Sequence, residues 1–165
     1  MAEFLSIDVT GLHELGIDLA RAVARLERPR DLMTTLGAVL EANIEHRFDT
    51  KRDPDGNQWA DLAETTLARY AAQDKGKRRG TVLERTGQMR NSLAANAGDD
   101  VVELGMSRLS TGGRWSIPLL HETGTEHMPR RGIFLSDPEA GTLGAGDLAD
   151  VDQALAAFLD DVFGG

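Results

Sequence analysis

Five oxygen-bearing side chains between positions 53 and 64 have the spacing of the ligands in a calcium-binding loop. They are Asp53, Asp55, Asn57, Asp61 and Glu64. In such a loop they would be the first, third, fifth, ninth and twelfth residues, which supply oxygen ligands to the ion. The sixth position, where the sharp turn requires glycine, is Gln58. A calcium-binding module built on residues 53–64 is therefore one hypothesis, and a plain polar turn is the other.

A second group of possible metal ligands lies in the segment 121–127, whose sequence is HETGTEH. The zinc-binding helix of metalloproteases needs two histidines four residues apart on one face. His121 and His127 are six residues apart, with Gly124 between them, and do not fit that pattern. A metal-dependent hydrolase using His121 and Glu122 remains one alternative. In the other, the His121 ring packs and hydrogen-bonds at the end of a strand.

The sequence offers little support for catalysis by a nucleophile. The chain has no cysteine, and none of its serines lies in a G-x-S-x-G context. No glycine pattern matches a phosphate or dinucleotide loop. We therefore expect no enzyme activity, no cofactor and no resident metal. Arg130 and Arg131 could grip phosphate, but we interpret them as guanidinium forks for the carboxylates of a neighbouring subunit.

Two helices and an extended arm are expected before this region. Alternating apolar residues at 5–9 indicate a strand or an extended arm. A helix with one apolar stripe follows, capped by Thr10 and stopped by Pro29. A second helix starts near Asp31 and ends before Asp53, because Pro54 disfavours helical backbone at the preceding residue. The two stripes are Leu12, Leu15, Leu19, Ala22 and Leu26, and then Leu32, Leu36, Leu40, Ile44 and Phe48.

The rest of the chain predicts a mixture of helices and strands. A turn at 53–57 precedes a short helix at 65–72, and residues 75–80 form a basic loop. Residues 93–97 and 101–106 flank Gly98 and should pair as a hairpin. The apolar runs 117–120 and 133–135 are interpreted as buried extended segments around the histidine turn. After a glycine-rich linker, Asp147 or a neighbouring residue caps a last helix.

This order predicts an α+β fold with N-terminal helices, a small antiparallel β-sheet with a hairpin, and a C-terminal helix. A chain of 165 residues suits one domain with extensions. We divide it into an arm and helix at 1–30, a core at 31–136, and a glycine linker with an acidic helix at 137–165. No apolar run approaches the ~20 residues of a membrane span, so we expect a soluble protein of a reducing compartment, without a membrane partner.

Charge is distributed unevenly along the chain. The net charge is −9, which argues against broad binding to nucleic acid. Residues 69–90 carry seven basic side chains against two acidic ones, whereas 137–165 contains Asp and Glu but no Lys or Arg. Such asymmetry could orient identical subunits head to tail, or could be two solvated faces. A nucleic-acid binder using the loop at 75–79 is a further alternative.

Four stretches, taken together, resemble one family. They are Arg47-Phe48 with DPDGNQWADL at 53–62 and Thr66; LERTGQMRNSL at 83–93; HETG at 121–124; and MPRR at 128–131 with Phe134-Leu135. Their order and spacing are similar to the phage virion morphogenesis proteins, the tail completion family of Mu-like and P2-like phages. The chain departs from the family pattern at Ile117-Pro118, at Glu122, and around Gly132, where the local register shifts. The resemblance extends over 32–136 and covers neither the first thirty residues nor the glycine linker.

The resemblance implies a structural protein of the virion that acts at the tail or neck. Such proteins assemble as rings, commonly sixfold, around the channel through which DNA passes, and they contact the tail tube and neck or connector proteins. The implied location is the virion tail or neck, after assembly in the host cytoplasm. An acidic bore, with Asp99-Asp100 as one candidate, would let DNA pass without specific binding.

Two sets of residues are predicted to matter for this role. The predicted interface residues are Arg78, Arg79, Arg85, Arg90, His121, Glu122, Arg130, Arg131, Asp160 and Asp161. The residues predicted to set the fold are Phe48, Asp55, Gly56, Trp59, Leu62, Thr86, Gly87, Pro129 and Phe134.

Overall fold

The computed structural model describes residues 10–27, 29–73 and 81–163 of the chain. Its elements are α1 (Thr10–Glu27), α2 (Arg30–Thr50), α3 (Glu64–Gln73), the 3₁₀ turn η1 (Arg90–Ser92), β1 (Leu93–Ala97), β2 (Val102–Met106), α4 (Ile117–Thr123) and α5 (Ala145–Phe163). The predicted α+β fold is confirmed. The predicted arm at 5–9 and the basic loop at 75–80, with Arg78 and Arg79, lie outside the described residues.

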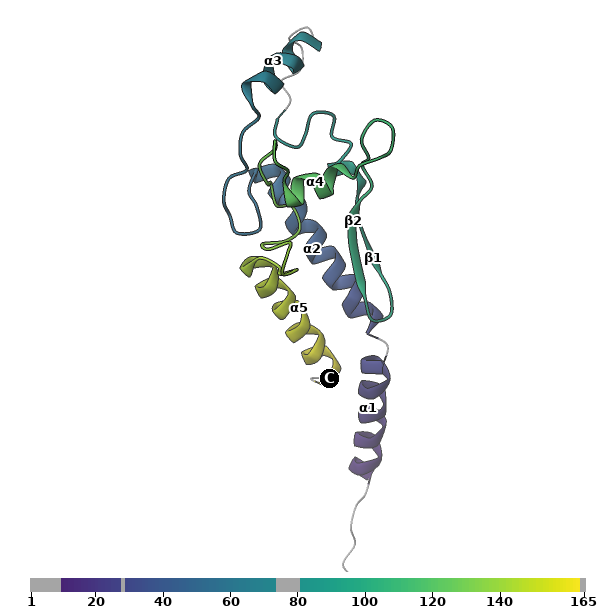
Figure 1. Cartoon of the computed structure of the whole chain (residues 1–165). Helices are drawn as coiled ribbons and strands as arrows, with labels where there is room; N and C mark the ends of the chain where they lie inside the picture. The colour runs from purple at the N-terminus through teal and green to yellow at the C-terminus, as the bar shows by residue number, and fades with distance from the viewer. Residues whose placement is uncertain (1–9, 28, 74–80, 164–165) are drawn as a thin grey trace, which may run out of the picture.

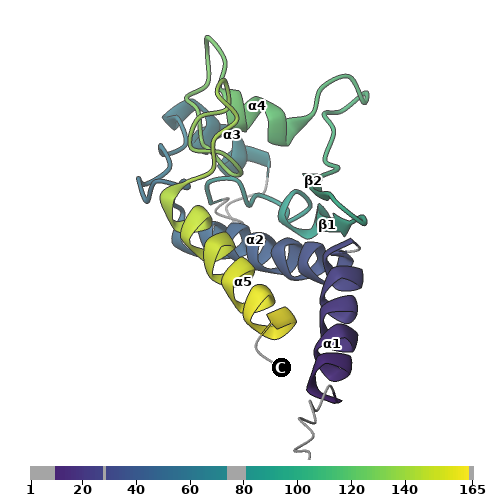
Figure 2. The same cartoon turned by 90° about the horizontal axis from the view of Figure 1, so that it is seen from below.

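Helix α2 is the central element of the molecule. The β1–β2 hairpin lies along one side of it and α5 along the other (Figures 1 and 2). Helix α1 extends beyond the N-terminal end of α2, and α3 projects at the opposite end (Figure 1). The molecule is therefore elongated, and its two ends are made of different elements.

The apolar stripe predicted for α2 faces the core as expected. Leu32, Ile44 and Phe48 are buried. The helix ends at Thr50 because Lys51 adopts a left-handed conformation with φ 59°, from which its backbone N–H donates to the carbonyl of Arg47. The helix therefore stops before Pro54, as the sequence predicts.

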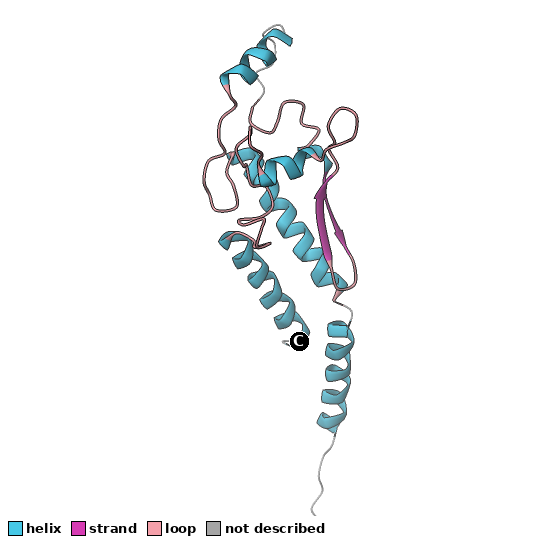
Figure 3. Ribbon diagram, viewed as in Figure 1, coloured by secondary structure: helices cyan, strands magenta, loops and turns pink. Residues whose placement is uncertain are grey.

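The hairpin is the only sheet among the described residues (Figure 3). β1 and β2 pair antiparallel, with Leu93 opposite Met106 and Ala97 opposite Val102. Alternate residues of both strands are half-buried, so one face of the hairpin packs on α2 and the other meets solvent. Gly37 of α2 allows this close packing, because a Cβ there would lie 3.2 Å from the Cβ of Ala95.

The core gathers at the C-terminal end of α2. Phe48 and Ile133 are fully buried and Trp59 is 3% exposed. The rings of Phe48 and Trp59 meet edge to face with centroids 5.4 Å apart. The indole N–H of Trp59 donates to the carbonyl of Gly132 at 2.9 Å. This bond connects the 53–62 turn region to the segment after Arg131.

Two predicted extended segments are not strands. Residues 117–120 belong to α4, whose N-terminus is capped by the Ser116 hydroxyl accepting from the N–H of Leu119. Pro118 lies in the first helical turn, where its missing N–H costs nothing. Residues 133–135 are irregular although Ile133 is buried. Burial was predicted correctly for Pro118 and Ile133 but not for Leu119, which is 59% exposed, and the length of the runs did not distinguish a strand from a short helix.

The stripes predicted for the first and last helices are only partly covered. In α1, Ala22 is buried, yet Leu19 is 58% exposed. In α5, Leu148 is 48% exposed and Phe163 60% exposed. Within a single chain these two helices therefore keep substantial apolar surface in solvent. In the part of the chain that the structure describes, no helix has the length and apolar character needed to cross a bilayer.

Candidate functional site

Glu122 organises the loop that follows α4. Its carboxylate accepts from three consecutive backbone N–H groups, with Oε2 2.6 Å from the nitrogen of Ile133 and 2.9 Å from that of Phe134, and Oε1 2.9 Å from that of Leu135. Three successive donors around one carboxylate form an anion-binding concavity. The buried Glu122 therefore replaces a partner strand for residues 133–135.

The two arginines after Pro129 act within the chain. Arg130 donates from Nε to the carbonyl of Glu122 and from a terminal nitrogen to that of Leu135. Arg131 is 4% exposed and donates to the carbonyls of Ala60 and Asp61 at 2.7 and 2.9 Å. Both guanidinium groups therefore hold backbone carbonyls of their own chain, and their predicted contact with the carboxylates of a neighbouring subunit stays a prediction.

His121 lies beside this loop with its ring half-buried. Its Nδ1 is buried and has no hydrogen-bond partner among the described residues. Burial, together with the nearby charge of Arg131, lowers the pKa of His121 from 6.5 to about 4. The ring is therefore neutral at physiological pH. It is packed as one interpretation expected, but at the end of a helix and without the expected hydrogen bond at Nδ1.

The 53–57 segment is a turn that uses its own side chains. The Asp53 carboxylate accepts from the backbone N–H groups of Asp55 and Asn57 at 2.9 and 2.8 Å. Gly56 has φ 81°, and the Asp55 carboxylate accepts from the Ser136 hydroxyl at 2.6 Å. Across the described residues, no three His, Asp or Glu side chains are gathered so as to hold a metal ion. The arrangement favours the turn interpretation over a calcium loop, and gives Glu122 a structural role instead of a metal-binding one.

A buried ion pair connects α2 to α5. The Arg47 guanidinium binds both carboxylate oxygens of Asp147 and also donates to the carbonyl of Ile133 at 2.7 Å. The Arg47 side chain is 8% exposed and that of Asp147 is 2% exposed. Asp147 was predicted to cap α5, whereas its carboxylate neutralises Arg47 across the helix interface. The sequence shows Arg47 only as an arginine one residue before a core phenylalanine.

A second charge cluster fixes the start of the 84–92 segment to α2. Glu84 accepts from Lys51 and, at 3.1 Å, from Arg90, which also pairs with Asp49 at 2.7 Å. Burial raises the pKa of Glu84, but the hydrogen bonds from Lys51 and Arg90 outweigh it and leave the pKa below its usual value. Arg90 was predicted at an interface. Its charge is already matched by Asp49 and Glu84 of the same chain.

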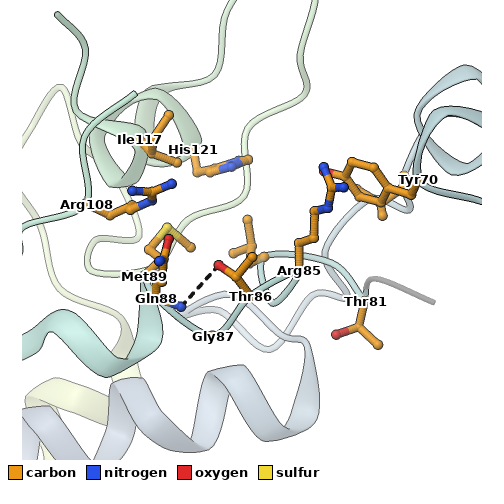
Figure 4. A pocket seen from close by; sticks show the side chains of 12 residues that line it. Tyr70, Thr81, Arg85, Thr86, Gly87, Gln88, Met89, Arg108, Ile117 and His121 are labelled. Atoms are coloured by element: carbon orange, nitrogen blue, oxygen red, sulfur yellow. Dashed lines mark hydrogen bonds between the residues drawn. The ribbon is translucent and has the colours of Figure 1, made fainter. Parts of the chain in front are cut away.

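An open pocket lies between α3, the 81–89 segment and α4 (Figure 4). Its volume is about 370 Å³. Arg85 stacks on the ring of Tyr70 at 4.0 Å and donates to Gln73, while Thr86 accepts from the N–H of Gln88 at 3.5 Å. Arg108, Ile117 and His121 line the other wall. None of the described residues lining the pocket is acidic.

Comparison with known protein families gives one match. The model of the phage virion morphogenesis family matches residues 11–132, which is most of the chain. The chain belongs to the phage virion morphogenesis family. The comparison with curated proteins and the comparison with solved structures gave no match.

The family match covers the stretches of the resemblance up to Arg131, without Phe134-Leu135, and reaches further toward the N-terminus. It begins at residue 11 and so includes α1, which the four matched stretches did not cover. It ends at Gly132, before Ile133 and before α5. Membership assigns the chain a role in building the phage particle and makes it a virion-associated protein.

The remaining predicted residues of this phage virion morphogenesis protein lie in different surroundings. Phe48 and Trp59 are buried, Leu62 and Phe134 are half-buried, Gly87 has φ 71°, and Pro129 is exposed. Asp161 pairs with Arg25 of α1 at 2.5 Å. Asp160 is exposed, and its carboxylate has no hydrogen bond or ion pair within the described residues. Arg108 was not predicted, because a single arginine after a strand carries no pattern of its own.

Proposed function

We propose that this chain completes the phage tail or joins it to the head, working as a homo-oligomeric ring around the DNA channel. The chain belongs to a family of virion morphogenesis proteins, and that membership carries the proposal. The proposed partners are other copies of the chain, arranged as a ring of six, together with the tail tube and the neck or connector proteins. The proposed location is the tail or neck of the virion, reached from the host cytoplasm during assembly.

The uncovered apolar faces of α1 and α5 support an assembly of this kind. Leu19 of α1 and Phe163 of α5 are 58% and 60% exposed, and further apolar side chains of both helices are exposed beside them. Contiguous apolar surface on a soluble protein commonly marks an interaction site. A protein that works alone would gain nothing from leaving this surface in water.

The ends of the molecule also suit a closing ring. A ring needs two different complementary patches on each subunit, because the interface is heterologous. The end that contains α3 carries Arg69, Arg85 and Arg108, and α5, which runs toward the other end, carries acidic residues but no Lys or Arg (Figure 1). Opposite charges on separate surfaces orient subunits head to tail.

An acidic protein suits a passage for DNA. Each phosphate neutralised by a lysine or arginine would add affinity through counterion release, whereas carboxylates repel the strand and let it move. The net charge of −9 is consistent with transient passage without specific binding. Asp99 at the hairpin tip pairs with Arg30 at 3.3 Å, whereas Asp100 beside it has no ion pair with any residue that the structure describes.

Size measurement tests this function. Sedimentation velocity at micromolar concentration, alone and with purified tail tubes, should show a closed oligomer or a stable complex with the tube end. A protein that stays monomeric under both conditions and never binds tubes or neck components would contradict the proposal.

A further inference from the structure

The pocket between α3, the 81–89 segment and α4 has the chemistry of a carboxylate-binding site. In a chain with 27 acidic and 18 basic residues, its described lining contains two guanidinium groups and no carboxylate. Arg85 is held against Tyr70 and Gln73. Arg108 is exposed, and its guanidinium group has no hydrogen bond or ion pair with any residue in the part of the chain that the structure describes. The pocket therefore presents a cation that can pair with an incoming anion.

The walls of the pocket are suited to a side chain carried on an apolar surface. Leu62, Met89 and Ile117 contribute apolar surface, and Thr81 and Gln88 contribute polar groups at the edge. Figure 4 shows Arg108, Ile117 and His121 on one side of the opening and Arg85 with Tyr70 on the other. A free inorganic anion would use only the polar part of this lining. An acidic residue next to large apolar residues would use both parts.

Helix α5 presents an acidic residue of this kind. Asp160 is exposed, its carboxylate has no partner among the described residues, and it lies between Leu159, which is 38% exposed, and Phe163, which is 60% exposed. Asp160 and Phe163 are three residues apart and therefore neighbours on one helical face. The opposite face of the helix, with Asp147, packs on α2. The face that contains Asp160 is thus free in the single chain.

Arg108 and Asp160 cannot satisfy each other within one molecule. The pocket lies beside α4, and α5 runs away from it to the C-terminus (Figures 1 and 2). We propose that Arg108 in this pocket binds the carboxylate of Asp160 from a second copy of the chain, with Phe163 of that copy against the apolar wall. This inference rests on the proposed ring and names one joint between its subunits. Because the two surfaces differ, the contact is heterologous and can close into a ring.

Charge exchange tests the pairing. Arg108→Glu and Asp160→Arg should each raise the dissociation constant of self-association, measured by sedimentation velocity, at least about tenfold, because each substitution places like charges together. The double variant Arg108→Glu with Asp160→Arg should restore most of the association. Arg114→Glu and Asp152→Arg are the matched controls, since they change exposed charges in the same regions outside the proposed contact. Far-ultraviolet circular dichroism verifies that each variant is folded.

A crosslinking test through introduced thiols does not depend on charge. The chain contains no cysteine, so Arg108→Cys with Asp160→Cys introduces the only two thiols. A bismaleimide reagent, which joins two nearby thiols through a spacer, should convert this double variant into covalent chains longer than a dimer on a denaturing gel, whereas each single variant can give a dimer at most. Arg108→Gln replaces Arg108→Glu if the glutamate variant does not fold, and the same loss of association is expected.

The outcomes separate this inference from the proposed function. The Arg108–Asp160 contact would be overturned if Arg108→Glu assembled like the wild type, or if the folded double variants neither recovered association nor crosslinked. Neither result would contradict the proposed ring itself. A wild-type protein that never associates would instead remove the proposed function. Normal self-association of Arg108→Glu with lost binding to tail tubes would show that the pocket takes an acidic side chain of the tube, and would also overturn the joint.

Discussion

The carboxylate of Glu122 accepts three consecutive backbone N–H groups, which in a sheet would be paired with a neighbouring strand. Arg130 and Arg131, which precede this loop, donate to backbone carbonyls, so an irregular segment is satisfied by side chains instead of secondary structure. The residues predicted to face a neighbour here are therefore required first for the fold of their own chain.

Glu122→Gln should lower the free energy of unfolding by about 2–4 kcal/mol. An amide is neutral and presents only one oxygen, so at least one of the three N–H groups loses its acceptor and the others face an uncharged one. Urea unfolding followed by fluorescence measures the change. Glu126→Gln, on an exposed glutamate of the same loop, should stay within about 0.5 kcal/mol of the wild type. Equal effects of the two substitutions would contradict the role assigned to Glu122.

His121 should make the protein less stable in mild acid. Its pKa is about 4 in the folded chain against 6.5 for the free side chain, so the unfolded chain binds more protons between these values. Stability from this group is fully present above pH 6.5 and is lost as the pH falls toward about 4. Because the ring is partly exposed, we expect a loss of about 1–2 kcal/mol across that window.

The difference between wild type and His121→Leu isolates this effect from the titration of carboxylates. Unfolding free energies measured from pH 7 to pH 4 should fall less steeply for His121→Leu than for the wild type. His127→Leu, on the exposed histidine of the same loop, serves as the control and should keep the wild-type slope. Parallel curves for wild type and His121→Leu would show that the ring is not held neutral by the fold.

At the scale of elements, a buried ion pair holds α5 on α2. Much of the apolar surface of α5 nevertheless stays exposed in the single chain. Asp147 binds Arg47, and Asn43 of α2 donates to both Asp147 and Asp150 at 3.1 and 2.8 Å. Gly144 allows the start of α5 to approach the 53–57 turn, since a Cβ there would lie 2.4 Å from the carbonyl oxygen of Pro54. The start of the helix is therefore fixed more firmly than its end.

Asp147→Asn should lower the free energy of unfolding by about 3–5 kcal/mol, because Arg47 would remain charged and buried without a counterion. Asp150→Asn keeps a hydrogen-bonding group for Asn43 and should cost less than about 1 kcal/mol. Replacing both partners, as Arg47→Leu with Asp147→Leu, should recover most of the loss. A double-mutant cycle with no coupling between the two positions would contradict the pairing.

Periodicity predicted the helices and the hairpin because those elements depend on local patterns. The stripe from Leu32 to Phe48 and the turn around Gly98 were sufficient for α2 and for β1–β2. The run at 117–120 was assigned to a strand, and the structure makes it α4, because a seven-residue helix has too few turns for its period to show. Long-range pairs such as Arg47 with Asp147, 100 positions apart, have no local signature.

In the candidate site, too, local patterns were predictable from the sequence and long-range contacts were not. Residues 53–62 and 121–131 were identified from the sequence as important, and the structure brings them together through Trp59, Arg131 and Glu122. Their roles were less predictable. The sequence does not distinguish a glutamate that binds a backbone loop from one that binds a metal or a neighbouring subunit. The role of Glu122 becomes clear only from the three backbone N–H groups that donate to it.

At the scale of the whole molecule, a small core supports two helices that leave apolar faces uncovered. Leu19 is 58% and Val23 46% exposed on α1. Leu19→Ser should raise the dissociation constant of self-association at least about tenfold, because burying a leucine side chain between subunits contributes about 1.5–3 kcal/mol. Its effect on the unfolding of the single chain should be small, since the side chain is already in water. Ala20→Ser, on an exposed neighbouring position, is the control for analytical ultracentrifugation.

The most direct test of the central claim, that this chain is a building block of the virion's tail or neck, is electron cryo-microscopy of particles from a phage that encodes it. We predict a ring of this subunit around the channel, at the end of the tail or in the neck, with α5 of each copy next to the pocket at α4 of the following one. Particles whose tail and neck contain no density for this subunit, although they are complete and infectious, would contradict the account.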